Sequence, residues 1–129
     1  MLRFSQTKIL LMRMFKENLI DFIKELTIQF QSEPDLHVIK VFFEEVCSVE
    51  DIIEYFCSNL LVPDIKKMIE TKNDLFFLKN DNLFTGIKNQ TKVFHFKKLW
   101  GESNKHQQEM IWQWIQKITK LADLYTKTD

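Results

Sequence analysis

FHFKKLWGESNKHQQEMIWQWIQKITKLADLY, residues 94–125, decides the fold, because it contains all three tryptophans of the chain and a continuous apolar stripe. From about residue 104 onward, apolar side chains recur at three- and four-residue steps, which is the pattern of a helix with one buried face. That face consists of Met110, Ile111, Trp114, Ile115, Ile118, Leu121, Ala122 and Tyr125. We therefore expect a long C-terminal helix near the centre of a helical bundle.

Trp112 lies outside this stripe. At about 100° per residue, it points roughly 130° away from the centre of the stripe. Two arrangements account for so large an apolar ring: the connector before the helix covers it, or it stays exposed as an anchor for a protein partner. Trp112 is therefore a candidate partner-binding residue.

Four more helices are predicted upstream. Apolar residues recur at helical steps over residues 14–30 and again over residues 35–46. The second of these helices is expected to bury Leu36, Ile39, Phe43 and Val46. A capping box at residues 48–51, SVED, starts a third helix, and Pro63 suits the first turn of a fourth that ends near residue 70. The predicted fold class is all-α, a single-domain bundle of about five helices.

Residues 71–103 lack a sustained period. Their aromatic residues lie among Asn, Asp, Thr and Gly, and are Phe76, Phe77, Phe84, Phe94, Phe96 and Trp100. A segment of this length without structure is uncommon in a compact domain. We predict an aromatic-anchored connector before the C-terminal helix, with short helical turns or a small strand around residues 93–96.

The length of 129 residues and the 45% hydrophobic content are those of one domain with a self-sufficient core. We assign residues 14–129 to this domain and residues 1–13 to an N-terminal extension, which is either flexible or the start of a helix. Residues 1–16 carry four bases and no acid, so mitochondrial targeting is an alternative. No apolar run approaches the roughly 20 residues that a membrane-spanning helix needs.

Neither a catalytic residue nor a metal or cofactor site is predicted. His37, His95 and His106 are isolated, without the i, i+4 spacing that places two imidazoles on one helix face. Cys47 and Cys57 lie in apolar runs and should be free thiols, and nothing signals an activated thiolate in a Cys57–His95 pair. Two glycines are too few for a phosphate-binding loop. We expect the protein not to be an enzyme.

Acidic residues are concentrated in one part of the chain, although the formal net charge is zero. Residues 33–64 contain eight acids and one base. Helical spacing places these acids on the outer faces of two helices, where they either face solvent only or contact a partner. Glu44, Glu45 and Asp51 are candidate partner-binding residues for this reason.

Basic residues prevail in residues 65–129, which contain twelve bases and seven acids. Lys88, Lys92, Lys97 and Lys98 lie near aromatic residues of the connector, the combination used by sequence-tolerant binders of single-stranded nucleic acid. These lysines are candidate nucleic-acid-binding residues. The segment contains no arginine, the residue that dominates base readout, so specific recognition of a base sequence is not expected.

Three segments carry a resemblance to a known family. They are DLFFLKNDNLFTGI at residues 74–87, FKKLW at residues 96–100 and EMIWQWIQKI at residues 109–118. Over roughly residues 14–122 the chain resembles a group of small, uncharacterised helical proteins of large nucleocytoplasmic DNA viruses (giant viruses). It departs from that group at Trp114, where Tyr is usual, and at residues 89–95, which lengthen a link.

The resemblance implies an intracellular, all-helical viral protein located in the host cytoplasm, the viral factory or the virion, and it implies no activity. The scarcity of glycine and proline beside abundant phenylalanine and lysine agrees with an A/T-rich genome of the kind many large DNA viruses have. The leading hypothesis is a non-catalytic interaction or accessory module that binds a viral or host protein. The alternative is a nucleic-acid-associated accessory protein that uses the lysine-rich connector.

Overall fold

The computed structural model describes residues 5–81, 83–87, 90, 92 and 94–128, and the regular elements of this part are all helical. They are α1 (Gln6–Gln29), α2 (Asp35–Val41), η1 (Phe42–Val46), α3 (Val49–Leu60), α4 (Pro63–Glu70), α5 (Leu75–Lys79), α6 (Phe96–Glu102) and α7 (Lys105–Lys127). The predicted all-α class is confirmed. The described residues form more helices than expected, because the connector contains α5 and α6.

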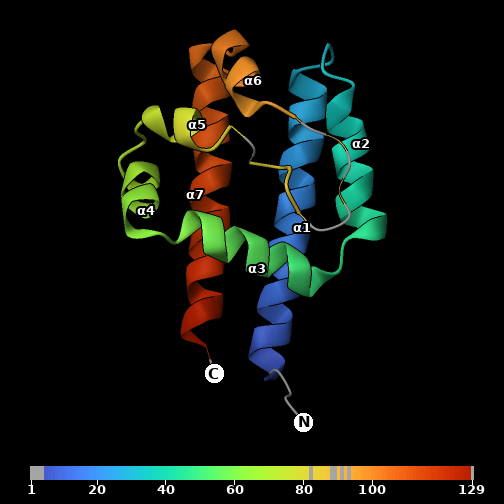
Figure 1. Cartoon of the computed structure of the whole chain (residues 1–129), viewed down its shortest axis with the longest axis vertical. Coiled ribbons are helices and arrows are strands. Elements are labelled where there is room, and N and C mark those ends of the chain that lie inside the picture. Colours follow the sequence, from blue (N-terminus) through green and yellow to red (C-terminus); the bar gives the residue numbers. More distant parts are fainter. Residues whose placement is uncertain (1–4, 82, 88–89, 91, 93, 129) are drawn as a thin grey trace.

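Two long helices form the centre of the molecule. The helices α1 and α7 lie side by side and run in opposite directions, so the start of α1 and the end of α7 lie at the same end of the molecule (Figure 1). Helix α2 packs along the other side of α1, and α3 crosses both α1 and α7. The chain then returns to the start of α7 through α4, α5 and α6, which cover one face and the upper end of α7 (Figure 1).

Helix α1 begins at Gln6, ahead of the predicted start at residue 14. The side chain of Ser5 caps it by accepting a hydrogen bond from the backbone N–H of Lys8 at 3.1 Å. Leu11 and Met12 extend the buried stripe of the helix by two positions. Residues 6–13 are therefore the first turns of α1.

The helix predicted over residues 35–46 changes its winding before it ends. It is an α-helix as far as Val41 and a π-helix from Phe42 to Val46, with the backbone N–H of Cys47 donating to the oxygen of Phe42 at 3.0 Å. The prediction that Val46 is buried was wrong, because its side chain is 62% exposed. An α-helical period does not describe positions in a π turn, where hydrogen bonds join residues five apart.

The connector is part of the core. Phe76, Phe77, Phe84, Phe94 and Phe96 are all buried. The alternative of a small strand around residues 93–96 is not what the structure shows, because α6 begins at Phe96, while residue 93 lies outside the described residues. Aromatic burial thus holds this segment in place where regular structure is short.

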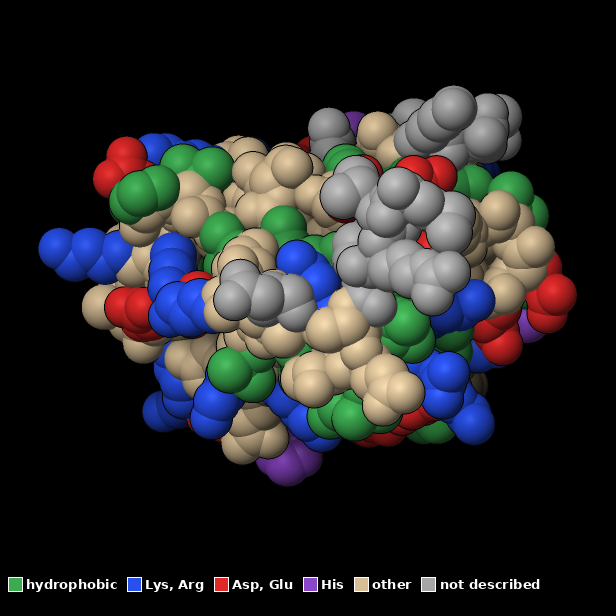
Figure 2. All heavy atoms as spheres, turned by 90° about the horizontal axis from the view of Figure 1, so that it is seen from below, with side chains coloured by type: hydrophobic (Ala, Val, Ile, Leu, Met, Phe, Trp, Pro, Cys, Tyr) green, Lys and Arg blue, Asp and Glu red, His purple; other side chains and the backbone are tan. Residues whose placement is uncertain are grey.

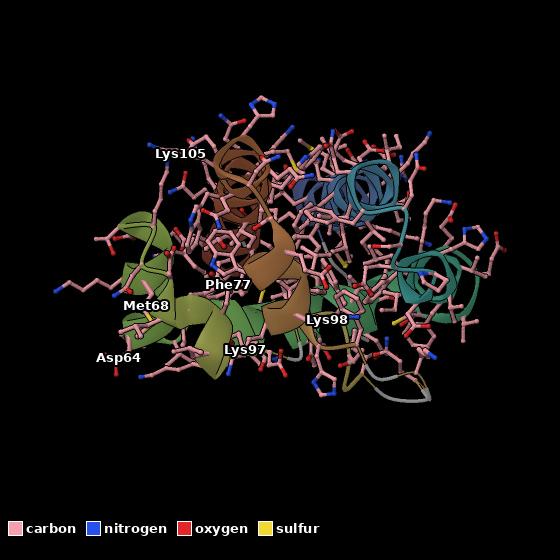
Figure 3. The ribbon with its side chains drawn as sticks, turned by 90° about the horizontal axis from the view of Figure 1, so that it is seen from above. Asp64, Met68, Phe77, Lys97, Lys98 and Lys105 are labelled. Atoms are coloured by element: carbon pink, nitrogen blue, oxygen red, sulfur yellow. The ribbon has the colours of Figure 1, made fainter. Side chains whose placement is uncertain are left out.

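Trp112 is covered from the connector side. It is 4% exposed, and its ring lies 5.9 Å from that of Phe76, 5.1 Å from that of Phe77 and 5.7 Å from that of Trp100 between ring centroids. Phe77 lies between α5, α6 and α7 when the molecule is seen from above (Figure 3). The prediction that the connector covers Trp112 is therefore confirmed. The alternative prediction, that Trp112 is an exposed partner-binding anchor, is wrong.

Candidate functional site

Four exposed residues of one helix form an apolar and acidic surface, which we name the α2–η1 ridge: Val38, Val41, Glu45 and Val46. The three valines are 51%, 40% and 62% exposed, respectively, and Glu45 lies among them. Exposed valines are ordinary when they are scattered, and these three lie on one short helical segment where His37 is also exposed. Exposed apolar side chains beside a charged one make this side of the helix a candidate contact surface for a protein partner.

The opposite side of this helix fixes the direction of the ridge. Leu36, Ile39 and Phe43 are completely buried, and α2 packs on α1 through this side. In the π turn, residues five apart become neighbours along the helix axis, so Val46 follows Val41 on the outer side. Single π turns are frequent at functional sites. The π winding therefore extends the ridge by one apolar residue.

The predicted partner-binding acids have different surroundings. Glu44 is half-buried and forms an ion pair with Lys40 at 2.8 Å, and its backbone oxygen accepts a hydrogen bond from Lys16 Nζ at 3.4 Å. Glu45 is exposed on the ridge. Asp51 is exposed in the first turn of α3, where a negative charge is favourable against the helix dipole. Of the three, Glu45 and Asp51 offer a carboxylate to a partner.

Two of the predicted nucleic-acid-binding lysines pair with acids of their own chain. Lys92 Nζ lies 3.0 Å from a carboxylate oxygen of Asp35, and Lys98 Nζ lies 3.4 Å from one of Glu33. Both acids belong to the start of α2 and the turn before it. The structure thus brings part of the basic connector against part of the acidic segment, which reduces the positive charge available to phosphates.

The other two lysines of that set differ. Lys97 is exposed next to Lys98 on α6 (Figure 3). Lys105, which is not one of the four, lies well apart from both at the start of α7. Lys88 lies outside the described residues. The described lysines of the connector therefore form no extended basic groove of the kind that tracks a nucleic-acid backbone.

Asp81 joins the connector to the start of α6. Its carboxylate accepts hydrogen bonds from the backbone N–H of Lys97 at 2.8 Å and contacts Nδ1 of His95 at 2.6 Å, and its backbone oxygen accepts from Phe96 N–H at 2.8 Å. His95, the residue before the helix, makes no side-chain cap of its own. Asp81 therefore caps α6 from a distant position in the chain.

We expect Asp81→Ala to lower the free energy of unfolding by about 1 kcal/mol, the usual cost of a lost helix cap. Burial would raise the pKa of Asp81, but the hydrogen bond from Lys97 N–H and the contact with His95 outweigh it and hold the pKa below its ordinary value of 3.8. A lowered pKa means that the contribution is fully present above about pH 5 and is lost as the pH falls through the lowered folded-state pKa. Urea unfolding at several pH values measures this.

Asp74→Ala is the matched control, because Asp74 precedes α5 without making a side-chain cap. The difference between the wild-type protein and Asp81→Ala should shrink as the pH falls from about 5 toward about 2. A cost for Asp81→Ala that is equal to that of Asp74→Ala would contradict the capping role.

The two cysteines are not set up as nucleophiles. Burial, assisted by Glu54, raises the pKa of Cys57 to about 11, and burial also raises the pKa of Cys47. The thiol of Cys57 lies 3.8 Å from the backbone oxygen of Ala122 and donates to it. A reactive cysteine needs a lowered pKa, so both thiols have the character of core residues. Neither cysteine forms a disulfide with a described residue.

The described residues contain neither a metal-binding cluster nor a membrane-spanning helix. This part of the chain contains no group of three or more His, Cys, Asp or Glu side chains placed to hold a metal ion. None of its helices is both long and apolar enough to cross a membrane.

No protein family, curated protein or solved structure matches this chain. The viral family resemblance stays a prediction from the residues of the three segments given above. The α2–η1 ridge brings three exposed valines and an exposed carboxylate together on one helical segment. Sequence reasoning identified Glu45 but missed the valines. Val38 and Val41 lie off the buried stripe and could have been found from the helical period, whereas Val46 could not.

Proposed function

We propose that this protein is a non-catalytic interaction module that binds another protein through the α2–η1 ridge. The observation that carries the proposal is the exposure of Val38, Val41 and Val46 beside Glu45 on a helix whose other side is completely buried. A helix anchored so firmly presents its outer side chains without further ordering, which lowers the entropic cost of binding.

The ridge defines the chemistry of its partner. Valines favour an apolar surface, and burying them contributes about 25 cal/mol for each Å² of apolar area removed from water. Glu45 favours lysine or arginine at the edge of that surface, where charges orient the partner and speed its approach. Seen from below, acidic side chains reach the surface on the side of the molecule where α2 lies, and basic side chains lie beside them (Figure 2). The partner we infer is therefore an apolar surface bordered by basic residues.

The setting we propose follows the family resemblance of the three segments: a viral protein that acts inside the infected cell, in the cytoplasm, the viral factory or the virion. An accessory module of this kind needs a docking surface and no catalytic group.

The test is affinity purification of the tagged chain from the cells in which it is expressed, with and without nuclease, followed by mass spectrometry. Wild-type protein is compared with the double variant Val41→Asp, Val46→Asp. The matched control is Leu75→Asp, Leu78→Asp, which places the same charges at two exposed leucines of α5, away from the ridge.

We expect a stoichiometric protein that survives nuclease treatment, either a different protein or the untagged form of this chain. Its recovery should fall at least about tenfold with the ridge variant and stay unchanged with the α5 control, because buried apolar contacts dominate binding energy. Equal recovery with all three proteins would contradict the proposal. Recovery that disappears with nuclease would instead favour the nucleic-acid alternative. In that case, Lys97→Glu should reduce the salt dependence of nucleic-acid binding.

A further inference from the structure

A groove lies between the first half of α1 and the start of α3. It has a volume of about 410 Å³ and is lined by Ile9, Met12, Arg13, Lys16, Val49 and Glu50. Three of the residues that line it are apolar, Ile9, Met12 and Val49, and its two bases outnumber its single acid. This groove is therefore apolar and mainly basic, the composition that the α2–η1 ridge requires of its partner.

The groove and the ridge are neighbours on the same molecule. Val46, the last residue of the ridge, is separated from Val49 in the groove by two residues, and Lys16 of the groove wall donates to the backbone oxygen of Glu44 in η1 at 3.4 Å. Figure 1 shows the link from α2 to α3 and the start of α3 beside α1. One chain thus carries two adjacent surfaces with opposite charge and similar apolar character.

The ridge of a chain cannot enter its own groove. Val38 and Val41 point away from α1, because the opposite side of α2 packs on it, while α1 forms one wall of the groove. The ridge of a second copy is not held in this way and is free to approach the groove. A two-fold axis near the junction of ridge and groove would then make the contact twice, once in each direction, as an isologous interface requires.

We propose that the occupant of the groove is the α2–η1 ridge of a second copy, so that the chain forms a two-fold symmetric dimer. This inference rests on the proposed function, because it takes the ridge to be a protein-binding surface and names its partner. The valines of one copy cover Ile9, Met12 and Val49 of the other, and Glu45 faces Arg13. The apolar contacts supply most of the affinity, and the charges select the orientation.

Sedimentation equilibrium of the full chain tests the proposal. A concentration range of about 1 to 100 µM covers the dissociation constants of dimers of moderate affinity. The expected result is a mass that rises with concentration toward twice the 15.6 kDa of one chain. A protein that stays monomeric over the whole range would overturn the dimer.

Charge reversal tests the pairing itself. Glu45→Arg and Arg13→Glu should each raise the dissociation constant at least about tenfold, because each places like charges against one another twice in the dimer. The double variant Glu45→Arg, Arg13→Glu should restore the dissociation constant to within about threefold of the wild-type value, since the two charges exchange places. A double variant that is as weak as either single variant would mean that the two residues do not meet.

Both residues are exposed, so the three variants should unfold at wild-type urea concentrations, which circular dichroism checks. Should either reversal disturb the fold, Glu45→Gln and Arg13→Gln remove the charges singly and should weaken the dimer in the same direction. The outcome also separates this inference from the proposed function. A monomeric chain whose ridge still captures a different protein would refute the dimer alone, and a monomeric chain that captures none would refute both.

Discussion

Phe77→Ala is expected to lower the free energy of unfolding by about 3 to 5 kcal/mol, the usual cost of truncating a buried phenylalanine. The ring of Phe77 lies 4.0 Å from that of Trp100, 5.3 Å from that of Phe96 and 5.1 Å from that of Trp112 between ring centroids. These partners come from α6 and α7, so one side chain of α5 joins the connector to the C-terminal helix. Its removal leaves a cavity at the junction of three helices.

Urea unfolding monitored by circular dichroism and by tryptophan fluorescence measures this loss. The neighbouring Leu78→Ala is the matched control, because Leu78 is 56% exposed and its truncation should change the stability by no more than about 0.5 kcal/mol. The fluorescence of the folded variant should also change, because Phe77 contacts two of the three tryptophans. If Phe77→Ala and Leu78→Ala cost the same, the aromatic cluster would not be holding the connector.

Phe22→Ala is expected to have an effect of the same size, about 3 to 5 kcal/mol. The side chain is 1% exposed, and its ring stacks on that of Trp114 at 6.0 Å and meets that of Phe84 edge to face at 5.5 Å. Phe22 therefore joins α1 to α7 and to the connector at the same time. Offset-stacked and edge-to-face pairs add about 0.5 to 1.5 kcal/mol each beyond the area they bury.

A double-mutant cycle with Phe84→Ala separates the two contributions. The coupling energy between Phe22 and Phe84 should be about 0.5 to 1.5 kcal/mol, because residues in direct contact are not additive. Ile28→Ala, on the same helix but 55% exposed, serves as the control and should cost little. Additive losses in the cycle would show that the connector does not rely on α1.

The helices that could be predicted are those with a long and regular apolar period. The final helix was expected from about residue 104 to 125, and α7 runs from Lys105 to Lys127 with a capping box made by Asn104 and Gln107. The start of α3 was also predictable, because the side chain of Ser48 caps it as the SVED motif indicates. In these cases local hydrogen bonds and periodic burial agree, so the sequence pattern is sufficient.

The connector could be predicted only in part. Its aromatic residues were expected to anchor it, and the buried phenylalanines do so. The positions of α5 and α6 were not predictable, because each is too short for its period to be recognised and α6 depends on a cap from Asp81, fourteen residues before His95. A contact between residues far apart in the chain cannot be recognised from a local sequence pattern.

The candidate surface shows the same division. The acids Glu44 and Glu45 were visible in the sequence, and Glu44 follows Lys40 at the i, i+4 spacing of an ordinary helical ion pair. The winding that exposes Val46 beside Glu45 was not visible, because nothing in the sequence indicates the π turn. The pairing of Lys92 with Asp35 and of Lys98 with Glu33 was equally invisible, because sequence reasoning treated the basic and acidic segments as separate surfaces.

The sequence by itself determined the helical class, the long helices and the apolar residues of their buried sides, because periodic burial and helix caps act over a few residues. Only the tertiary structure decided that Trp112 is covered, that two connector lysines are paired and that a basic groove lies beside an acidic ridge. Those features require segments far apart in the chain to meet. Which segments meet depends on the packing of α1, α2, α3 and α7 as a whole, and not on the preference of any one of them.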